Sequence, residues 1–296
     1  MLIAVTGANG FVGQRVVGEL RRRTHSVIAY TRRQWDLRSG PLESPPEDVA
    51  AVVHCAARVS DWGPAAAFVR DNVDGTRAVL DSFRASPRFV YVSTASVYDP
   101  WGPKRMVRED ASYASKYLNS YAHSKMLAER VVRSCGRPTI IVRPHAVYGP
   151  GDRTLLPRLL AARRFGRLVA VGDGRNLLSV THVDNLVQAI VRAVEGDVRD
   201  GIFNVADAET VALDKLLRTV LERLRLPTRV SYLPARVAWP MATALERVYG
   251  LARSRRPPLL TPYIVSQIST ECTLDIERAR TLLGYAPTFD CRTGPL

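Results

Sequence analysis

Residues 1–13 read MLIAVTGANGFVG, and this stretch decides the fold of the chain. The apolar run Leu2 to Val5 predicts a buried strand, and Gly7, Gly10 and Gly13 follow it in a GxxGxxG pattern. Glycines at this spacing allow a tight turn and let the backbone approach a pyrophosphate, whose charge meets the N-terminus of the next helix. Because the pattern ends a strand and opens a helix, it predicts a dinucleotide-binding site instead of an ordinary turn.

Apolar runs alternate with amphipathic stretches over the first two-thirds of the chain, as in parallel βαβ units. Strands are predicted at 2–5, 27–30, 49–55, 89–93 and 139–142, and helices at 13–23, 72–84 and 120–133. The consecutive apolar residues of these strands indicate burial on both faces. The predicted fold class is therefore α/β, a doubly wound parallel sheet of the Rossmann type with a smaller C-terminal substrate lobe.

The pattern changes after Pro150, where short helical segments are interrupted by proline and glycine. Helices are predicted at 155–165, 186–194, 213–224, 235–251 and 276–283, with a strand at 168–171. We expect residues 1–150 to form the dinucleotide-binding domain, with 173–205 returning to it, and residues 151–172 and 206–296 to form the substrate lobe. The apolar stretch 237–242 could line a pocket or contact a membrane, but its spacing favours packing inside the lobe, and Pro240 predicts a kink or an early break.

The net charge of +14 comes from 42 basic residues, of which 38 are arginine. The basic runs at 21–23, 163–164 and 253–256 are scattered and lack interleaved aromatic residues, which argues against nucleic-acid binding. An anionic cofactor, an acidic substrate or a membrane surface stays open as a partner. Neither a membrane-spanning run nor a signal peptide is visible, so a cytoplasmic protein is expected. The four cysteines show no CxxC spacing and predict no metal site.

The residues after the second predicted strand decide which dinucleotide is preferred. An NAD site usually carries an Asp or Glu there, which accepts hydrogen bonds from the ribose hydroxyls. This chain has Thr31, Arg32 and Arg33 instead. Guanidinium groups form bidentate bonds to a 2′-phosphate, so NADP(H) is favoured over NAD, although an arginine-rich chain could place arginines there without such a role.

Tyr121 and Lys125 are spaced to share one face of a predicted helix. A nearby ammonium favours the phenolate and should lower the pKa of the tyrosine, while the same lysine can reach the ribose of a nicotinamide nucleotide. The pair follows a strand that ends in Ser93 and Thr94, at the edge of the sheet where open α/β sheets bind their ligands. These residues predict an acid–base site instead of a surface tyrosine resting on a lysine stem.

Together these motifs make the chain similar to the extended short-chain dehydrogenase/reductases along almost its whole length. The resemblance rests on the GxxGxxG, the YxxxK, and the segments 54–57 (HCAA), 72–76 (NVDGT), 93–98 (STASVY), 143–144 (RP), 148–151 (YGPG) and 182–185 (HVDN). It implies that Thr94 is the catalytic Ser/Thr, Tyr121 the acid or base and Lys125 its partner. It also implies that Asn72 helps to order the site and that a homodimer forms through a bundle that includes the Tyr121 helix.

The cofactor site predicted from the motifs and the resemblance has an adenosine end and a nicotinamide end. Asp36 and Leu37 would contact the adenine, and Pro144 to Val147 would line the nicotinamide. The full set is Gly7, Asn9, Gly10, Phe11, Val12, Gly13, Thr31, Arg32, Arg33, Asp36, Leu37, Ala56, Ala57, Asn72, Tyr121, Lys125, Pro144, His145, Ala146 and Val147. Only five positions separate Thr31 from Asp36, so the helix and third strand usual in the family are missing or much shortened.

The family includes dehydrogenases, epimerases and dehydratases, and two absences narrow the choice. Dehydratases resemble one another in a Thr-Asp-Glu at the catalytic threonine, whereas Thr94 is followed by Ala95 and Ser96. Nucleotide-sugar epimerases commonly carry a diphosphate-binding arginine four residues before the His-Val-Asp motif, where this chain has Leu178, although Arg153, Arg158 or Arg175 could substitute.

The segments 58–64 and 178–185 resemble the 3β-hydroxysteroid dehydrogenase branch, which includes sterol-carboxylate dehydrogenases and bacterial 3-oxoalkanoate reductases. The resemblance implies NADP(H)-dependent interconversion of a hydroxyl and a ketone on a small apolar substrate. Two alternatives stay open: a nucleotide-sugar 4-epimerase or reductase with bound NAD, and a non-catalytic NADP-sensing protein.

Overall fold

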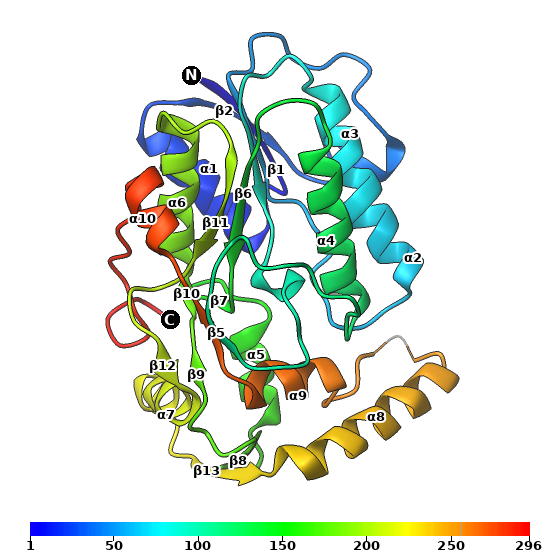
Figure 1. The fold of residues 1–296 in the computed structure, drawn as a ribbon, viewed down its shortest axis with the longest axis vertical. Coiled ribbons are helices and arrows are strands. Elements are labelled where there is room, and N and C mark those ends of the chain that lie inside the picture. The colour runs from blue at the N-terminus through cyan, green and yellow to red at the C-terminus, as the bar shows by residue number, and fades with distance from the viewer. Residues whose placement is uncertain (255) are drawn as a thin grey trace.

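A six-stranded parallel sheet forms the centre of the computed structural model, which describes residues 1–254 and 256–296. The strand order is β11-β6-β4-β3-β1-β2 and all neighbouring strands are parallel, which confirms the predicted doubly wound α/β fold class. The strands are β1 (Leu2–Thr6), β2 (Ser26–Tyr30), β3 (Ala51–His54), β4 (Phe89–Val92), β6 (Ile140–Pro144) and β11 (Gly201–Val205). Their consecutive Val, Ile and Ala residues are buried because helices cover both faces of the sheet (Figure 1).

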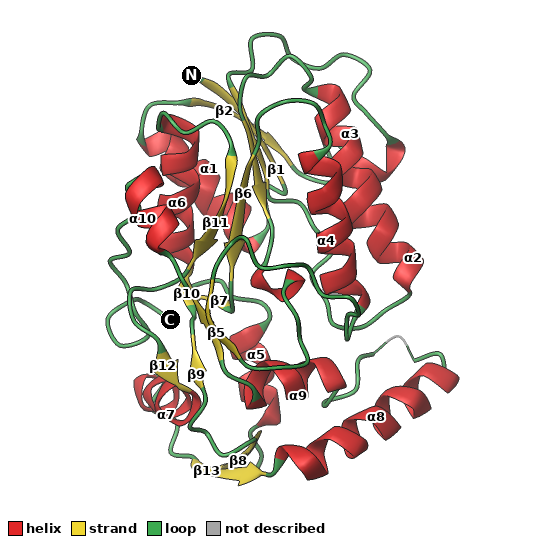
Figure 2. Ribbon diagram, in the orientation of Figure 1, coloured by secondary structure: helices red, strands yellow, loops and turns green. Residues whose placement is uncertain are grey.

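One face is covered by α1 (Phe11–Arg22), α6 (Val183–Glu195) and α10 (Glu277–Leu283), and the other by α3 (Gly75–Ser82) and α4 (Ser120–Arg133) (Figures 1 and 2). The predicted helices at 13–23, 120–133 and 186–194 are confirmed. The predicted helix 72–84 begins earlier than expected, because α2 (Ala65–Phe68) continues through a π-helical turn (Val69–Asp74) into α3.

The edge of the sheet next to β2 confirms the shortening expected between Thr31 and Asp36. In the described part of the chain no strand pairs with the outer side of β2, and a 3₁₀ turn (Leu37–Ser39) follows instead. Trp35 packs edge-on against Tyr30 with ring centroids 5.3 Å apart. The short connection therefore returns directly to the core without building a further βα unit.

The second lobe consists of the remaining elements, most of which follow β6. Its strands are β5 (Lys104–Val107), β7 (Val147–Tyr148), β8 (Arg167–Val171), β9 (Leu177–Leu178), β10 (Thr181–His182), β12 (Val211–Ala212), β13 (Arg229–Leu233) and β14 (Cys272–Leu274). Its helices are α5 (Leu155–Ala162), α7 (Leu213–Arg223), α8 (Ala235–Leu251) and α9 (Pro262–Ser269). The last helix, α10, packs on the Rossmann core through Ala279 and Leu283, although it follows the lobe in sequence.

Helix α8 corrects one expectation, because it runs unbroken through Pro240 from Ala235 to Leu251. The proline lies in its second turn, where the ring removes only one hydrogen bond of a helix that is seventeen residues long. Ala238 and Ala242 are fully buried against the lobe, whereas Val237 and Met241 are about half exposed, so only one side of the stretch 237–242 packs inside the lobe. Among the described residues, no helix has both the length and the apolar character that a membrane crossing would need.

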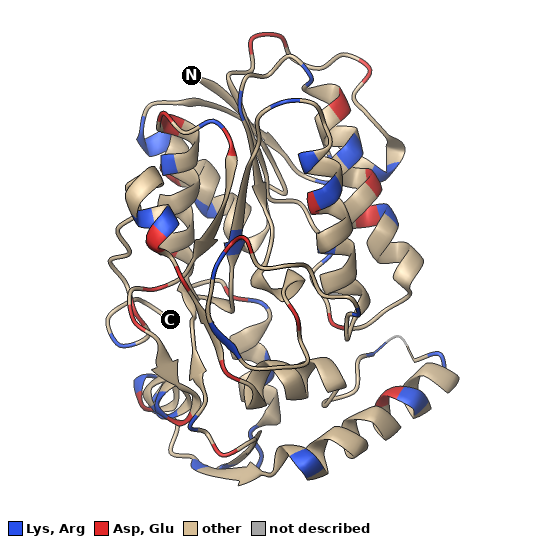
Figure 3. Ribbon diagram, viewed as in Figure 1, with Lys and Arg blue, Asp and Glu red and all other residues tan. Residues whose placement is uncertain are grey.

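Charged positions lie on the outer helices and loops, and the strands of the central sheet are almost free of them (Figure 3). Arg143 on β6 is the exception, because it is fully buried. Basic and acidic positions are mixed on the visible helices, so the net charge of +14 does not gather on one helix in this view.

Candidate active site

The glycine turn after β1 has no room for side chains. Gly7 has a φ of +68°, and a Cβ on it would lie 2.7 Å from the backbone nitrogen of Ala56. A Cβ on Gly13 would lie 2.1 Å from the carbonyl oxygen of Gly7, so α1 can pack this closely on the turn only because Gly13 has no side chain. The N-terminus of α1 begins directly after Gly10 and faces this turn. These contacts fit a cradle for a dinucleotide pyrophosphate.

A cavity of about 450 Å³ opens from this turn along the carboxyl ends of β1, β2 and β3. Nine of the predicted cofactor residues line it: Gly7, Asn9, Gly10, Thr31, Arg32, Asp36, Leu37, Ala56 and Ala57. Seven further lining residues were not predicted: Thr6, Tyr30, Trp35, Arg38, Cys55, Arg58 and Asp71. The other predicted cofactor residues lie outside this cavity: Phe11, Val12, Gly13, Arg33, Asn72, Tyr121, Lys125, Pro144, His145, Ala146 and Val147.

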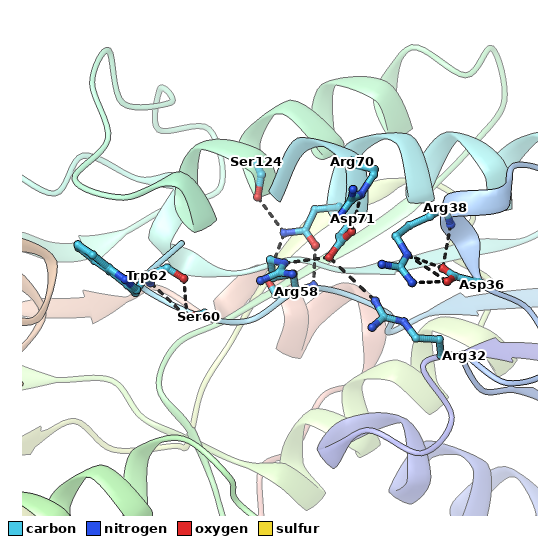
Figure 4. Close-up of polar contacts among 10 residues, drawn as sticks. Arg32, Asp36, Arg38, Arg58, Ser60, Trp62, Arg70, Asp71 and Ser124 are labelled. Atoms are coloured by element: carbon cyan, nitrogen blue, oxygen red, sulfur yellow. Dashed lines mark hydrogen bonds and ion pairs between the residues drawn. The ribbon is translucent and has the colours of Figure 1, made fainter. Parts of the chain in front are cut away.

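Arginines gather at the end of the cavity that lies beside β2 (Figure 4). Arg58 Nε donates to Asp71 Oδ2 at 2.8 Å, and Arg32 Nη2 lies 4.0 Å from the same oxygen. Burial alone would raise the pKa of Asp71, but the hydrogen bonds from Arg58 and Arg70 outweigh it and leave the pKa below its usual value. Asp71 therefore stays ionised and holds guanidinium groups at the rim of the cavity.

Asp36 has a similar role near Arg32, where its carboxylate pairs with Arg38 and caps the 3₁₀ turn. The hydrogen bonds from Arg38 hold the pKa of Asp36 well below its usual range. Arg38 was not predicted for the cofactor site because it belongs to no motif. Arg58 was also not predicted, although it begins the segment 58–64 and directly follows the predicted Ala57.

Thr94 and Tyr121 approach one another from the end of β4 and the first turn of α4. Thr94 accepts the backbone N–H of Ser96 and caps a 3₁₀ turn (Ala95–Val97), while Asn119 caps α4 by accepting the N–H of Ala122 at 2.9 Å. Burial raises the pKa of Tyr121 well above its usual value, Tyr263 adds to this, and the nearby Thr94 hydroxyl opposes it. Tyr121 is therefore a neutral phenol that can donate a proton.

The structure corrects the expected effect of Lys125 on the pKa of Tyr121. Its ammonium donates to the Val92 carbonyl at 2.7 Å and lies 4.1 Å from the ring centroid of Tyr91. Within the described residues no hydrogen bond joins Lys125 to Tyr121, and the pKa of Tyr121 is raised instead of lowered. Burial also lowers the pKa of Lys125 itself to about 7.

Asn72 forms hydrogen bonds both to the loop after β3 and to α4, the helix that carries Tyr121 and Lys125. It lies in the π-helical turn, and its Nδ2 donates to Ser124 Oγ at 2.8 Å, next to Lys125 in sequence. Its Oδ1 accepts the backbone N–H of Arg58 at 2.6 Å. Single π-helical turns are frequent at functional sites, and here the turn gives Asn72 the reach to join two segments that the sheet alone would leave separate.

Helix α9 lies beside the 3₁₀ turn that follows Thr94 and was not predicted. Thr261 caps it by accepting the N–H of Ile264, and Pro262 occupies its first position, so a Thr-Pro start was the available signal. Tyr263 Oη lies 3.0 Å from Ser96 Oγ, and one turn further on Gln267 Oε1 lies 3.1 Å from His145 Nε2.

His145, at the predicted nicotinamide end, also has its other ring nitrogen paired. Its Nδ1 lies 2.6 Å from the Ser179 carbonyl oxygen. Burial would lower the pKa of His145, but Cys272, the Ser179 carbonyl and Gln267 together raise it to about 9. The imidazole therefore holds the loop after β6 against β9 and α9.

Comparison with known proteins places this arrangement in a family. Residues 3–206 match the model of the NAD-dependent epimerase/dehydratase family. A 2-alkyl-3-oxoalkanoate reductase of Stenotrophomonas maltophilia is 31% identical over 99% of this chain and 97% of its own length. The decarboxylating sterol-4-alpha-carboxylate 3-dehydrogenase of Mus musculus is 28% identical over 96% of this chain and 86% of its own.

A solved structure shows the same fold. The UDP-glucuronic acid 4-epimerase from Bacillus cereus in complex with NAD superimposes with a TM-score of 0.74 at 21% identity, covering 99% of this chain and 96% of that one. The predicted resemblance to the branch of 3-oxoalkanoate reductases and sterol-carboxylate dehydrogenases is confirmed. The chain belongs to the NAD-dependent epimerase/dehydratase family and is an NAD(P)-dependent dehydrogenase/reductase of the extended short-chain type.

Proposed function

We propose that this chain is an NADP(H)-dependent oxidoreductase that interconverts a hydroxyl and a ketone on a small apolar substrate, steroid-like or 3-oxoacyl-like. The observation that carries the proposal is the meeting of Thr94 and Tyr121 at the carboxyl end of β4, with the buried Lys125 one turn along α4. Two hydroxyl donors in such a place can hold one carbonyl oxygen.

In this mechanism the hydroxyls of Thr94 and Tyr121 donate hydrogen bonds to the substrate carbonyl. Tyr121 then gives its phenolic proton to the oxygen during reduction, and it takes a proton back during oxidation. The raised pKa of Tyr121 suits the acid role, because the phenol stays protonated until charge develops on the oxygen. The nicotinamide, when bound, supplies or accepts the hydride. Lys125 and Asn72 keep α4 and the loop after β3 in register with the cofactor cradle.

The substrate class is supported by the relatives. The names of both curated relatives describe a carbon skeleton with a carboxylate and an oxygen function that is reduced or oxidised. Ala95 and Ser96 follow Thr94, so the acids that elimination would need are absent from these two positions. Leu178 is buried in the core of the lobe, where it cannot bind a diphosphate.

The preference for NADP(H) is supported by the charges at the rim of the cavity. Arg32, Arg38 and Arg58 line it, and each is held near an ionised aspartate that keeps its guanidinium in place. A 2′-phosphate on the adenosine ribose would add a dianion to this rim, where guanidinium groups bind it with charge-assisted hydrogen bonds.

The test is a screen of NADPH and NADH oxidation against 3-keto lipids, 3-ketosteroids and sugar nucleotides, with Tyr121→Phe beside the wild type. We expect NADPH-dependent reduction of a keto lipid or steroid, its loss in Tyr121→Phe, and nearly unchanged NADPH binding by calorimetry. Full activity of Tyr121→Phe would reject the assignment of the acid. Copurified NAD together with UDP-sugar binding, and no ketone reduction, would favour the epimerase alternative.

A further inference from the structure

Three hydroxyl groups lie in a row beside Tyr121. Thr94 Oγ1 donates to Ser96 Oγ at 3.2 Å, and Ser96 Oγ lies 3.0 Å from Tyr263 Oη. Thr94 and Ser96 come from the carboxyl end of β4, whereas Tyr263 comes from α9 of the other lobe. The row therefore crosses from the cofactor domain to the substrate lobe.

The position of Tyr263 is fixed by its own helix. Thr261 caps α9, Ser266 Oγ donates to the Pro100 carbonyl at 2.6 Å, and Gln267 contacts His145. These bonds attach α9 to loops that follow β4 and β6. The anchored helix therefore holds the Tyr263 hydroxyl beside Ser96.

A single carbonyl does not use all of these hydroxyls. Tyr121 and Thr94 provide the two donors that one carbonyl oxygen accepts readily. When Thr94 turns its proton to the carbonyl, one proton of the Ser96–Tyr263 pair joins the two hydroxyls and the other is free, since burial raises the pKa of Tyr263 to about 12 and leaves it a neutral donor. This free proton favours an oxygen acceptor over an alkyl group, because an alkyl group would leave the proton without an acceptor.

The charged side chains near Tyr263 are paired or shifted toward the neutral form. Asp61, which is almost fully buried, pairs with Arg158 of α5 at 2.5 Å, and Thr261 Oγ1 lies 3.4 Å from the same carboxylate. Burial, with Asp61 adding to it, raises the pKa of Glu246 on α8. These described side chains therefore carry no excess positive charge, so a substrate group bound at Ser96 and Tyr263 does not have to be an anion.

We propose that Ser96 and Tyr263 bind a second substrate oxygen, carried by a carboxylate or a neutral acyl carbonyl two carbons from the reacting ketone carbon. The inference rests on the proposed function and narrows its substrate to 3-oxoacyl compounds. The 3.2 Å between Thr94 and Ser96 matches two oxygens carried on alternate carbons of one chain. The reacting ketone takes Tyr121 and Thr94, and the second oxygen takes Ser96 and Tyr263.

The test compares 3-oxodecanoate, methyl 3-oxodecanoate and 3-decanone as substrates with NADPH. All three share the ketone and chain length, and only the first two carry the second oxygen. We expect the wild-type kcat/KM to be at least about tenfold higher for the two 3-oxoacyl compounds than for 3-decanone, as one hydrogen bond would give. The acid and the ester differ in charge, so their ratio separates a carboxylate site from a neutral one.

Tyr263→Phe and Ser96→Ala should each lower the ratio of kcat/KM for the 3-oxoacyl compounds to kcat/KM for 3-decanone by about tenfold. The double variant should lose less than the product of the single losses, because the two hydroxyls share one acceptor. Tyr232→Phe is the matched control, since the Tyr232 hydroxyl bonds Asp214 elsewhere in the same lobe. It should leave the ratio between substrates at the wild-type value.

Equal kcat/KM for 3-decanone and the 3-oxoacyl compounds in the wild type would overturn the inference while leaving ketone reduction intact. An equal loss on all three substrates in Tyr263→Phe would also overturn it, since that would show a structural role. Absence of any ketone reduction would remove the proposed function and this inference with it.

Discussion

Glu129 and Arg143 form a bidentate ion pair in which both side chains are almost completely buried. Arg143 Nη2 lies 2.6 Å from Glu129 Oε2, and Nε lies 3.0 Å from Oε1. Ser93 and Tyr113 also donate to the same carboxylate. Glu129 is one turn beyond Lys125 on α4, so the pair anchors the catalytic helix to β6 at the place where the strand turns toward the site.

Glu129→Gln should lower the free energy of unfolding by about 3–5 kcal/mol, because it leaves the buried guanidinium of Arg143 without a counter-charge. Urea denaturation measures the change. Asp81→Asn is the control, since the exposed pair of Asp81 and Arg84 should contribute less than about 1 kcal/mol. Replacing both partners, as in Glu129→Leu with Arg143→Met, should recover part of the loss. Equal losses for Glu129→Gln and the control would contradict this account.

Because Lys125 is buried, we expect the free energy of unfolding to depend on pH. Burial lowers its pKa to about 7, whereas in the unfolded chain it titrates near 10.4, so between these values the unfolded state binds the extra proton. The penalty for burying the ammonium is therefore full below pH 7 and is relieved as the pH rises. The stability of the wild type relative to Lys125→Met should rise by about 1.4 kcal/mol per pH unit between pH 7 and 10.

Urea titrations of the cofactor-free protein at several pH values measure that difference. Lys215→Met is the matched control, because Lys215 is exposed on α7. Its difference from the wild type should not change with pH. A flat difference for Lys125→Met would show that the ammonium is solvated in the native state.

Replacement by alanine should be harmful at one glycine of α1 and stabilising at another. Gly13→Ala would place a Cβ 2.1 Å from the Gly7 carbonyl oxygen, so the helix must move away from the turn, and NADPH binding should weaken by at least about tenfold. Gly18 has nothing within 4 Å of its Cβ position, and Gly18→Ala should raise the free energy of unfolding by about 0.5–1 kcal/mol. Calorimetry and denaturation test both, and unimpaired NADPH binding by Gly13→Ala would contradict the cradle.

Arg38→Gln should raise the KM for NADPH by about tenfold and change the KM for NADH little. The substitution removes one guanidinium from the rim and frees Asp36, whose carboxylate then repels a 2′-phosphate. Arg84→Gln removes the same kind of side chain from an exposed pair outside the cavity and should alter neither KM. A parallel rise for both cofactors would place Arg38 against the pyrophosphate instead.

The sequence predicted the central sheet well because its strands are short apolar runs whose burial is decided locally. The shortened connection before Asp36 was also visible, since five positions cannot hold a helix and a strand. The course of α8 through Pro240 was not, because it depends on how the helix packs on the lobe, where Ala238 and Ala242 are buried, and such packing is not visible in the local sequence.

The candidate site was predicted only where a motif carries it. Thr94, Tyr121 and Lys125 belong to local patterns, and the structure places them at neighbouring strand and helix ends. Tyr263 of α9 and Arg58 of the loop after β3 are brought to the site by tertiary packing. The spacing of residues in the sequence does not predict such contacts. The pKa of Tyr121 was misjudged because desolvation depends on what surrounds the ring and cannot be read from the YxxxK pattern.

No described strand pairs with the outer side of β2. The edge of the sheet and the residues at the adenosine end of the cavity therefore belong to one short segment of the chain. In most sheets of this type an interior strand would carry the discriminating residues, and their backbone would be insulated from solvent on both sides. Here the amides of β2 that point away from β1 have no partner strand among the described residues, and Thr31 and Arg32 of the cavity follow the strand. Hydrogen exchange along β2 should therefore slow when the adenosine end is occupied, which makes this edge a built-in reporter of cofactor binding.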